Sequence, residues 1–224
     1  MNMDPAAISA DRAGVAASSS PVDGRALRRH DNAQRLYDAA DRLLATTGFD
    51  DLSVDDICEL AGVGRATFFR IYGTKAGLLR EFNRRLAVDA ELRLDAAGPA
   101  DVKAALGVVA DAIVDAWRHA GPGHLGMARA FAHSVPHTDP HAAHPELFLL
   151  VESIVGAGMD RGELSDSVPR ELAAALALIQ LTAPIAYTLA GGTADTHHLA
   201  HLLLNQWYTG MTSAAPTPSN DRHA

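Results

Sequence analysis

The chain has 224 residues, of which 48% are hydrophobic and 5% aromatic, and a formal net charge of −8 at pH 7. This length fits one large domain or two small ones. The single cysteine, Cys58, excludes an intramolecular disulfide framework and is typical of a reducing compartment. No run of about 18 apolar residues indicates a membrane span, and the N-terminus does not resemble a signal peptide. We therefore expect a cytoplasmic protein.

The negative charge is unevenly distributed along the chain. Residues 25–75 and 76–95 are each neutral, whereas residues 1–24 carry a net charge of −2 and residues 96–224 carry −6. An acidic chain does not favour a nucleic-acid partner, but a neutral segment with several arginines permits one. The acidity therefore lies away from the part before residue 96, and the charge distribution permits that part to bind DNA.

The N-terminal part begins with a tail and a helix. Residues 1–24 are rich in Ala, Ser, Pro and Gly with weak periodicity, which predicts a disordered tail. Apolar residues at helical spacing then predict a helix over about 30–47, which Gly48 ends.

The segment 53–79 predicts a helix-turn-helix followed by a third helix. Ser53 is a candidate N-cap, and acidic residues follow it in the first helical turn, where the helix dipole is positive. The sequence Gly62-Val63-Gly64 predicts a tight turn in which glycine can adopt positive φ. Residues 65–72 then form a second short helix that Gly73 stops, and a longer helix runs from about 74 to 96. In such a motif the second helix enters the DNA major groove.

The remaining sequence predicts further helices and no strands. Gly- and Pro-rich breaks separate helical segments at roughly 100–119, 124–134, 145–160, 169–190 and 195–210. The last two are apolar nearly all round, which indicates burial in a core or against a partner. Pro184 should kink the first of these two. From Ala214 a second polar tail is expected.

The segment from about Arg28 to Leu79 resembles the DNA-binding domain of the TetR family of bacterial transcriptional repressors. The matching positions are Gly48-Phe49, Ser53-Val54-Asp55-Asp56-Ile57, Ala61-Gly62-Val63, Thr67, Phe69, Tyr72, Lys75 and Leu78. The resemblance implies an all-α protein with a helix-turn-helix domain at 25–79, a helical effector-binding and dimerisation domain at 80–213, and a tail at 214–224. It also implies a homodimer formed through the last two helices. A small, apolar effector would release this dimer from double-stranded operator DNA, with no cofactor.

The recognition helix carries the sharpest site hypothesis. Arginine grips guanine O6 and N7 bidentately, and the resemblance places Lys75 on a DNA phosphate. Phe69 stands where the family usually has Tyr, Ile71 replaces a common His or Tyr, and Gly64 replaces a Ser. Phosphate affinity is therefore expected to depend on Arg70, Lys75 and an Arg28-Arg29 arm. The full DNA-binding set is Arg28, Arg29, Ser53, Gly64, Arg65, Ala66, Thr67, Phe69, Arg70 and Lys75.

The resemblance also places an effector cavity among the middle helices of the second domain. A cavity with few polar groups would suit a hydrophobic ligand. The alternative for any one of these residues is ordinary core packing. The candidates are Ile113, Trp117, Phe131, Phe148, Val151, Glu152, Leu181 and Tyr187.

Other classes of function stay open at this point. His133, His137, His141 and His144 have the spacing of ligands on one helical face, but Pro136 and Pro140 interrupt the segment, so no metal site is predicted. A metal- or redox-responsive DNA-binding sensor that uses the His133–His144 cluster or Cys58 is the main alternative, although a buried inert thiol is expected. His197 and His201 form a separate i, i+4 pair. A transcriptional activator and a non-specific architectural protein are further alternatives. The chain contains no G-x-S-x-G, H-E-x-x-H, P-loop or dinucleotide fingerprint, so no enzyme is expected.

Overall fold

The computed structural model describes residues 21–132 and 144–212, and within these ranges the regular structure is helical, with no strands. This confirms the expected all-α class. The helices are α1 (Pro21–Leu44), α2 (Val54–Ala61), α3 (Arg65–Tyr72), α4 (Leu78–Ala97), α5 (Val102–His119), α6 (Pro122–Ala132), α8 (Pro145–Asp160), α9 (Arg170–Leu189) and α10 (Thr196–Thr212).

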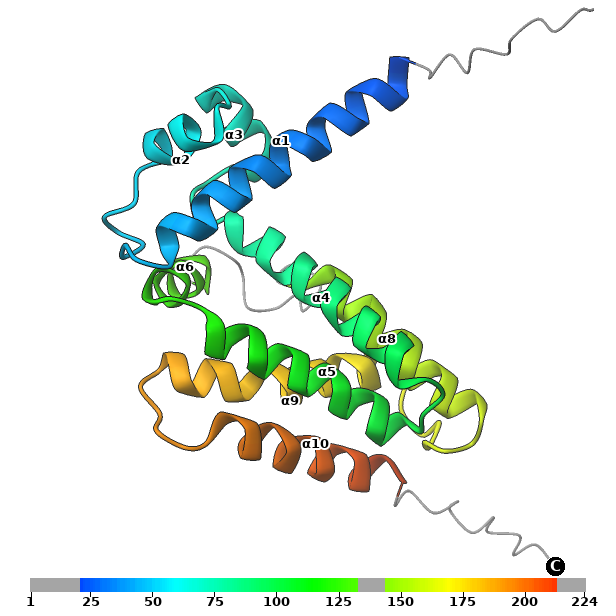
Figure 1. Ribbon diagram of the computed structural model, residues 1–224. Coiled ribbons are helices and arrows are strands. Elements are labelled where there is room, and N and C mark those ends of the chain that lie inside the picture. The colour runs from blue at the N-terminus through cyan, green and yellow to red at the C-terminus, as the bar shows by residue number, and fades with distance from the viewer. Residues whose placement is uncertain (1–20, 133–143, 213–224) are drawn as a thin grey trace, which may run out of the picture.

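The helices are arranged as a small head on a larger body (Figure 1). α1, α2 and α3 form the head, and α4 runs from the head into the body beside α8. α5 and α9 lie across the body, and α10 packs against both of them. α6 lies beneath the C-terminal end of α1, where head and body meet.

Two helix starts differ from the sequence prediction. α1 begins at Pro21 instead of near His30, so residues 21–24 belong to a helix rather than to the expected tail, and the other tail residues lie outside the described part. α4 begins at Leu78 instead of near Thr74. Residues 74–77 form a tight turn in which the amide of Gly77 donates to the Thr74 hydroxyl (3.1 Å). The turn leaves Lys75 outside the helix.

The hydrophobic core has two parts, and the boundary between them does not follow the chain order. One part fills the space between α4, α5, α8, α9 and α10, and the other lies under α1, α2 and α3. α6 contributes Met127, Ala128 and Phe131 to the second part, although it follows α5 in sequence. The head core is therefore completed by a helix from the C-terminal region, so a boundary at residue 79 does not divide the core.

α9 is the one described helix that is long and apolar enough, by length and composition, to cross a membrane. It packs between α8 and α10, and Ala177, Leu178 and Leu181 are buried there, as in the core helix of a helical bundle. Pro184 lies inside α9, which continues to Leu189 as one helix.

Candidate nucleic-acid interface and effector region

Local hydrogen bonds fix the start of α2. The hydroxyl of Ser53 accepts a hydrogen bond from the amide of Asp56 (3.0 Å), and the Asp56 carboxylate accepts one from the amide of Ser53 (3.3 Å). This reciprocal pair is a capping box, which satisfies two amides that the first helical turn leaves unpaired. The predicted N-cap is confirmed. Ser53 stays exposed, and its hydroxyl already serves the cap.

The turn between α2 and α3 needs one glycine in particular. Gly62 has φ of 61°, a left-handed conformation that glycine adopts without a steric penalty, whereas Gly64 has φ of −66°. The guanidinium of Arg35 donates to the carbonyl of Ala61 (2.6 Å), which ties the turn to α1. Val63 is buried within the head. The turn is therefore held rigidly in the orientation that presents α3.

α3 is divided into a buried face and an exposed face. Phe68 and Tyr72 are buried, and the Tyr72 hydroxyl donates to the carbonyl of Ala33 in α1 (2.7 Å). The side chains of the opposite face are free to reach a groove, because the anchoring contacts use only the buried face. Gly64, Arg65, Ala66, Phe69 and Arg70 are exposed, and Thr67 is half-buried.

Two arginines of α3 have partners on the exposed face. The Arg65 guanidinium donates to the carboxylate of Asp55 in α2 and lies over the Phe69 ring, 5.3 Å from its centroid. Arg70 makes a long contact of 3.4 Å with the Thr67 hydroxyl. Because both members of the Arg65–Asp55 pair are more than half exposed, water screens the interaction and the pair is easily opened. The ion pair therefore orients the Arg65 side chain on the exposed face and leaves it available to contact DNA.

Lys75 occupies a different environment from the one expected. Its ammonium donates to the backbone carbonyls of Phe49 (2.5 Å) and Leu52 (2.8 Å), and it lies 4.3 Å from the centroid of the Phe49 ring. These contacts link the turn before α4 to the loop between α1 and α2. Its cationic group is thus turned toward the protein instead of standing free for a DNA phosphate.

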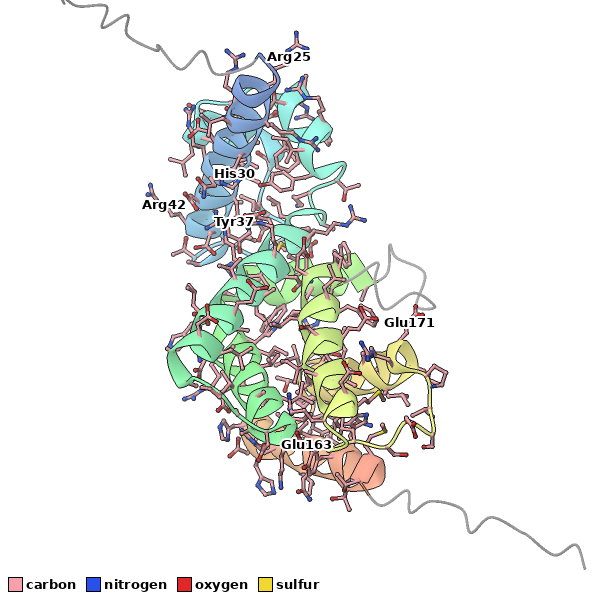
Figure 2. All side chains as sticks on the ribbon, turned by 90° about the vertical axis from the view of Figure 1, so that its right-hand side faces the viewer. Arg25, His30, Tyr37, Arg42, Glu163 and Glu171 are labelled. Atoms are coloured by element: carbon pink, nitrogen blue, oxygen red, sulfur yellow. The ribbon has the colours of Figure 1, made fainter. Side chains whose placement is uncertain are left out.

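Arg28 and Arg29 are exposed, but they do not form an arm. Both lie in the N-terminal half of α1, which is continuous with the helix that packs under α3. Figure 2 shows Arg25 at the outer end of this helix, at the opposite end of the molecule from Glu163. The basic side chains of α1 therefore project from a continuous helix.

At the junction of head and body a buried histidine joins α6 to α1. The His124 ring is 4% exposed; its Nδ1 accepts a hydrogen bond from the amide of Gly121 (3.2 Å). The proton consequently resides on Nε2, which donates to the Asp41 carboxylate (2.8 Å). This hydrogen bond holds the pKa of Asp41 below its ordinary value, against the opposing effect of burial. The sequence reasoning missed this pair, whose members are 83 residues apart.

The comparisons with known proteins agree with this geometry. Residues 36–82 match the model of the tetR family of bacterial regulatory proteins. A Mycobacterium tuberculosis (strain ATCC 25618 / H37Rv) protein named as a mycofactocin biosynthesis transcriptional regulator, MftR, is 46% identical over 48 residues. That stretch is 21% of this chain and 24% of the relative, so the match spans about a quarter of the relative's length.

Solved structures extend the likeness to the whole fold. FadR of Thermus thermophilus, a TetR-family transcriptional repressor in complex with lauroyl-CoA, superposes with a TM-score of 0.62 at 22% identity, covering 83% of this chain and 98% of that one. FadR of Bacillus subtilis in complex with stearoyl-CoA gives a TM-score of 0.52 at 16% identity, covering 80% and 98%.

The head therefore resembles the DNA-binding domain of the TetR family, whose model residues 36–82 match. As in TetR-family proteins, an N-terminal helix-turn-helix head stands on a C-terminal helical body. The position of α3 in the head is that of the recognition helix of a helix-turn-helix.

Within this TetR-type body, the predicted effector residues do not all lie together. Ile113, Phe148, Val151 and Leu181 are buried in the body core, and Phe131 is buried in the head core. Trp117 packs against both cores and Glu152 is half-buried. Tyr187 is the exception: it is 46% exposed at the C-terminal end of α9, beside Gly192, so it lies outside the core.

Two residues of α4 that the sequence reasoning did not select, and His144 of the histidine cluster, lie on the helices that border this region. Phe82 of α4 stacks on Trp117 with 4.8 Å between ring centroids, and its neighbour Asn83 is 1% exposed. His144, at the start of α8, is half-buried, and desolvation of its ring lowers the pKa of the imidazole from 6.5 to about 4. Asn83 lies on the buried face of α4 with Leu79 and Leu86, and a polar residue on an otherwise apolar helix face is the kind of signal that could have identified this lining.

Among the described residues, the cysteine alternative has little support. Cys58 is 8% exposed, and burial raises the pKa of its thiol, which disfavours the reactive thiolate. Of the histidine cluster, His133, His137 and His141 lie outside the described residues. His144 is the one member among the described residues, and a single histidine does not make a metal site.

Proposed function

We propose that this protein is a DNA-binding transcriptional repressor that a small apolar ligand releases from its operator. The observation that carries the proposal is the junction at α6. The helix supplies side chains to the core under the recognition helix and also packs on the body where the candidate ligand-binding residues lie. A rearrangement of the body can therefore move the head, because packed interfaces shift between discrete arrangements.

The exposed face of α3 supports the DNA-binding part of the proposal. Arg65, Ala66 and Thr67 stand at its N-terminal end, where the side chains of recognition helices meet base edges. Arg70, together with Arg28 and Arg29 of α1, is placed to contact phosphates. Lys75 is not among these DNA-contacting residues, and we propose that it stabilises the fold through its hydrogen bonds to the carbonyls of Phe49 and Leu52.

The apolar stripe along α9 supports a homodimer. Leu172, Leu176 and Ile179 are 47%, 40% and 51% exposed, and their spacing places them on one face of the helix. Tyr187 continues the same face, and Leu202 of α10 is 43% exposed. Such a surface on two neighbouring helices is typical of a four-helix interface with a second copy. Two copies would present their recognition helices about 34–36 Å apart, one turn of B-DNA.

The junction of α4, α5, α6 and α8 is the proposed ligand-binding region. The aromatic residues Phe82, Trp117, Phe131 and Phe148 and the buried Asn83 supply mainly apolar surface with few polar groups, which suits a hydrophobic ligand. The two FadR proteins with this fold hold lauroyl-CoA and stearoyl-CoA. A long-chain acyl thioester is therefore the first ligand class to test.

Two contacts support the transmission of a conformational change from the ligand-binding region to the head. Arg129 of α6 donates two hydrogen bonds to the carbonyl of Leu189 at the end of α9 (3.1 and 2.9 Å). At the other end of α6, His124 is bonded to Asp41 of α1. α6 is thus fixed to the proposed dimer helix and to the head. A ligand that binds one of two arrangements of α6 more tightly would shift the equilibrium between them, and with it the DNA affinity, by at most the difference between its two binding free energies.

Fluorescence anisotropy tests the proposal directly. The labelled DNA is the region upstream of the protein's own gene, with a scrambled duplex as control, across a salt series. We expect tight, sequence-selective binding, with two protomers or a multiple of two on each site. Lauroyl-CoA should reverse this binding, and free CoA should not. Equal, salt-sensitive binding to both duplexes would instead indicate an architectural protein. A reporter gene behind the bound site then distinguishes repression from activation.

A further inference from the structure

A cluster of three potential metal ligands lies on the body, away from the recognition helix and the junction. It comprises Asp111 of α5 with His197 and His201 of α10. The Nε2 atom of His201 lies 2.7 Å from Asp111 Oδ1, and the Nε2 atom of His197 lies 3.0 Å from the same oxygen. All three ligand atoms fall within 4.8 Å of one another. Two imidazole nitrogens and a carboxylate oxygen thus converge on one point.

The helical framework aligns these side chains. His197 and His201 are one turn apart on α10, and their ring centroids are 4.6 Å apart. Asp111 faces them from α5, against which α10 packs. One turn earlier on α5, Gly107 lies under the His201 ring, with 3.7 Å from a Cβ at that position to His201 Cε1. The cluster therefore joins two packed helices and is not a chance meeting of loop side chains.

The donor set and its spacing fit a particular class of ion. Imidazole nitrogen with one carboxylate suits borderline divalent cations such as Zn²⁺, Co²⁺ and Ni²⁺ better than Ca²⁺ or Mg²⁺, which prefer oxygen donors. With bonds of about 2.0–2.1 Å, tetrahedral ligand atoms stand about 3.3 Å apart. The nitrogen–oxygen distances of 2.7 and 3.0 Å need to widen by only a few tenths of an ångström. All three side chains are partly exposed, so water can reach the site and complete the coordination.

We propose that Asp111, His197 and His201 bind one divalent transition-metal cation of the Zn²⁺ class, which clamps α10 to α5. Each imidazole coordinates through an Nε2 lone pair, so any proton now donated from Nε2 to Asp111 moves to Nδ1 or to solvent. The ion replaces these hydrogen bonds with shorter coordinate bonds and holds α10 in a fixed position on the body. The site does not depend on the proposed function, because its geometry involves neither DNA nor the effector region.

Co²⁺ titration of the full-length protein, produced without a histidine tag and freed of metal by a chelator, tests this site. Triple replacement of His133, His137 and His141 by alanine gives the background, so that these histidines do not compete. We expect one Co²⁺ per protomer with the intense visible absorption of tetrahedral cobalt, and displacement of that ion by Zn²⁺. His201→Ala and Asp111→Asn should each weaken Co²⁺ binding by more than about tenfold, because even loss of an outer-shell partner costs about 10–100-fold.

His198→Ala is the matched control, since His198 is an exposed neighbour on the same helix and is not part of the cluster. It should leave the stoichiometry and the spectrum unchanged. The His197 ring is more than half exposed, so His197→Ala removes a ligand with little effect on packing, and a loss of Co²⁺ binding in this variant is not due to misfolding. Circular dichroism verifies that each variant keeps its helical content. The proposal would be overturned if the background protein failed to bind Co²⁺. It would also be overturned if the His201→Ala and His198→Ala proteins bound Co²⁺ with equal affinity. Neither result would affect the proposal of operator binding.

Discussion

At the scale of single residues, Arg65 carries the most specific expectation for DNA recognition. It stands at the exposed N-terminal end of α3 and pairs with Asp55, and the pair is open to solvent. Arg65→Ala should cost roughly 1–3 kcal/mol of operator binding and relax specificity at one base pair. Anisotropy measured on the operator and on single-base variants of it gives both quantities.

Asp55→Asn is the natural companion of that experiment. An exposed ion pair contributes only about 0–1 kcal/mol, so this change should leave the free energy of unfolding nearly unaltered. It also removes a negative charge next to the DNA face. Equal loss of affinity for operator and scrambled DNA in Arg65→Ala would show that Arg65 contacts phosphate instead of a base.

Lys75 is expected to act on stability. Lys75→Met removes an ammonium that donates to the carbonyls of Phe49 and Leu52, and leaves two partly buried acceptors without that donor. Loss of hydrogen bonds to a charged group costs about 1.5–3 kcal/mol, so the urea midpoint should fall accordingly. Arg70→Ala, at an exposed site, should instead weaken DNA binding at unchanged stability. If Lys75→Met kept its midpoint but reduced the salt slope of DNA binding by about one, the phosphate role would be restored.

The Asp41–His124 pair predicts a pH dependence of stability. Its hydrogen bond lowers the pKa of Asp41 in the folded protein below the ordinary value of 3.8. The pair therefore stabilises the protein above about pH 4, and this contribution is lost as the pH falls through the lowered pKa. Asp41→Asn should flatten the acid limb of a plot of denaturation midpoint against pH. Asp50→Asn, an exposed carboxylate on the adjoining loop, controls for the lost charge and should leave the limb steep.

At the scale of elements, local chemistry explains which helices were predicted well. α2 and α3 were anticipated because the signals that start and stop them, Ser53 and Gly73, lie next to the helices that they bound. The starts of α1 and α4 were misplaced, because weak periodicity hid the helical residues 21–24 and a hydrogen-bonded turn replaced the first turn expected for α4.

Contacts between distant parts of the chain could not be read from spacing. His124 meets Asp41 across 83 residues, and His201 meets Asp111 across 90. The i, i+4 spacing of His197 and His201 was visible, but its carboxylate partner depends on how α10 packs on α5. The family resemblance predicts Tyr187 in the effector cavity, whereas the rotation of α9 places it on an exposed face.

The approach of α6 to α1 predicts an effect of adding a single methyl group. A Cβ at Gly123 would lie 2.5 Å from the carbonyl oxygen of Thr47 and 2.7 Å from that of Leu44. Backbone atoms cannot rotate away, so Gly123→Ala should displace α6 and cost about 1–3 kcal/mol. Thermal denaturation measures this loss, and ligand-induced release from DNA should weaken in parallel because α6 is proposed to transmit the signal.

Gly210→Ala provides the matched comparison for that variant. Within the described structure a Cβ at Gly210 of α10 meets no atom within 4 Å. Alanine is favoured over glycine in a helix by about 0.5–1 kcal/mol, so the protein should be unchanged or slightly stabilised. Wild-type stability and wild-type ligand response in Gly123→Ala would show that the contact between α6 and α1 is loose and would weaken the role given to α6.

At the scale of the whole molecule, the exposed stripe on α9 determines whether two recognition helices can act together. Ile179 is 51% exposed in the middle of that stripe. In a dimer closed by α9 and α10, an aspartate there would place two uncompensated charges in an apolar interface, which is strongly unfavourable. Ile179→Asp should therefore halve the molar mass measured by light scattering, with an unchanged helical content.

The same variant tests how operator affinity depends on assembly. A monomer presents one recognition helix, so its affinity for the operator should fall toward its affinity for scrambled DNA, because the second major-groove contact is lost. Leu92→Asp is the control: Leu92 lies on α4 and is more exposed than Ile179, so a charge there should leave both molar mass and affinity unaltered. A dimer that survives Ile179→Asp would move the interface away from α9, and the spacing of the two heads would then have to be set by another surface of the body.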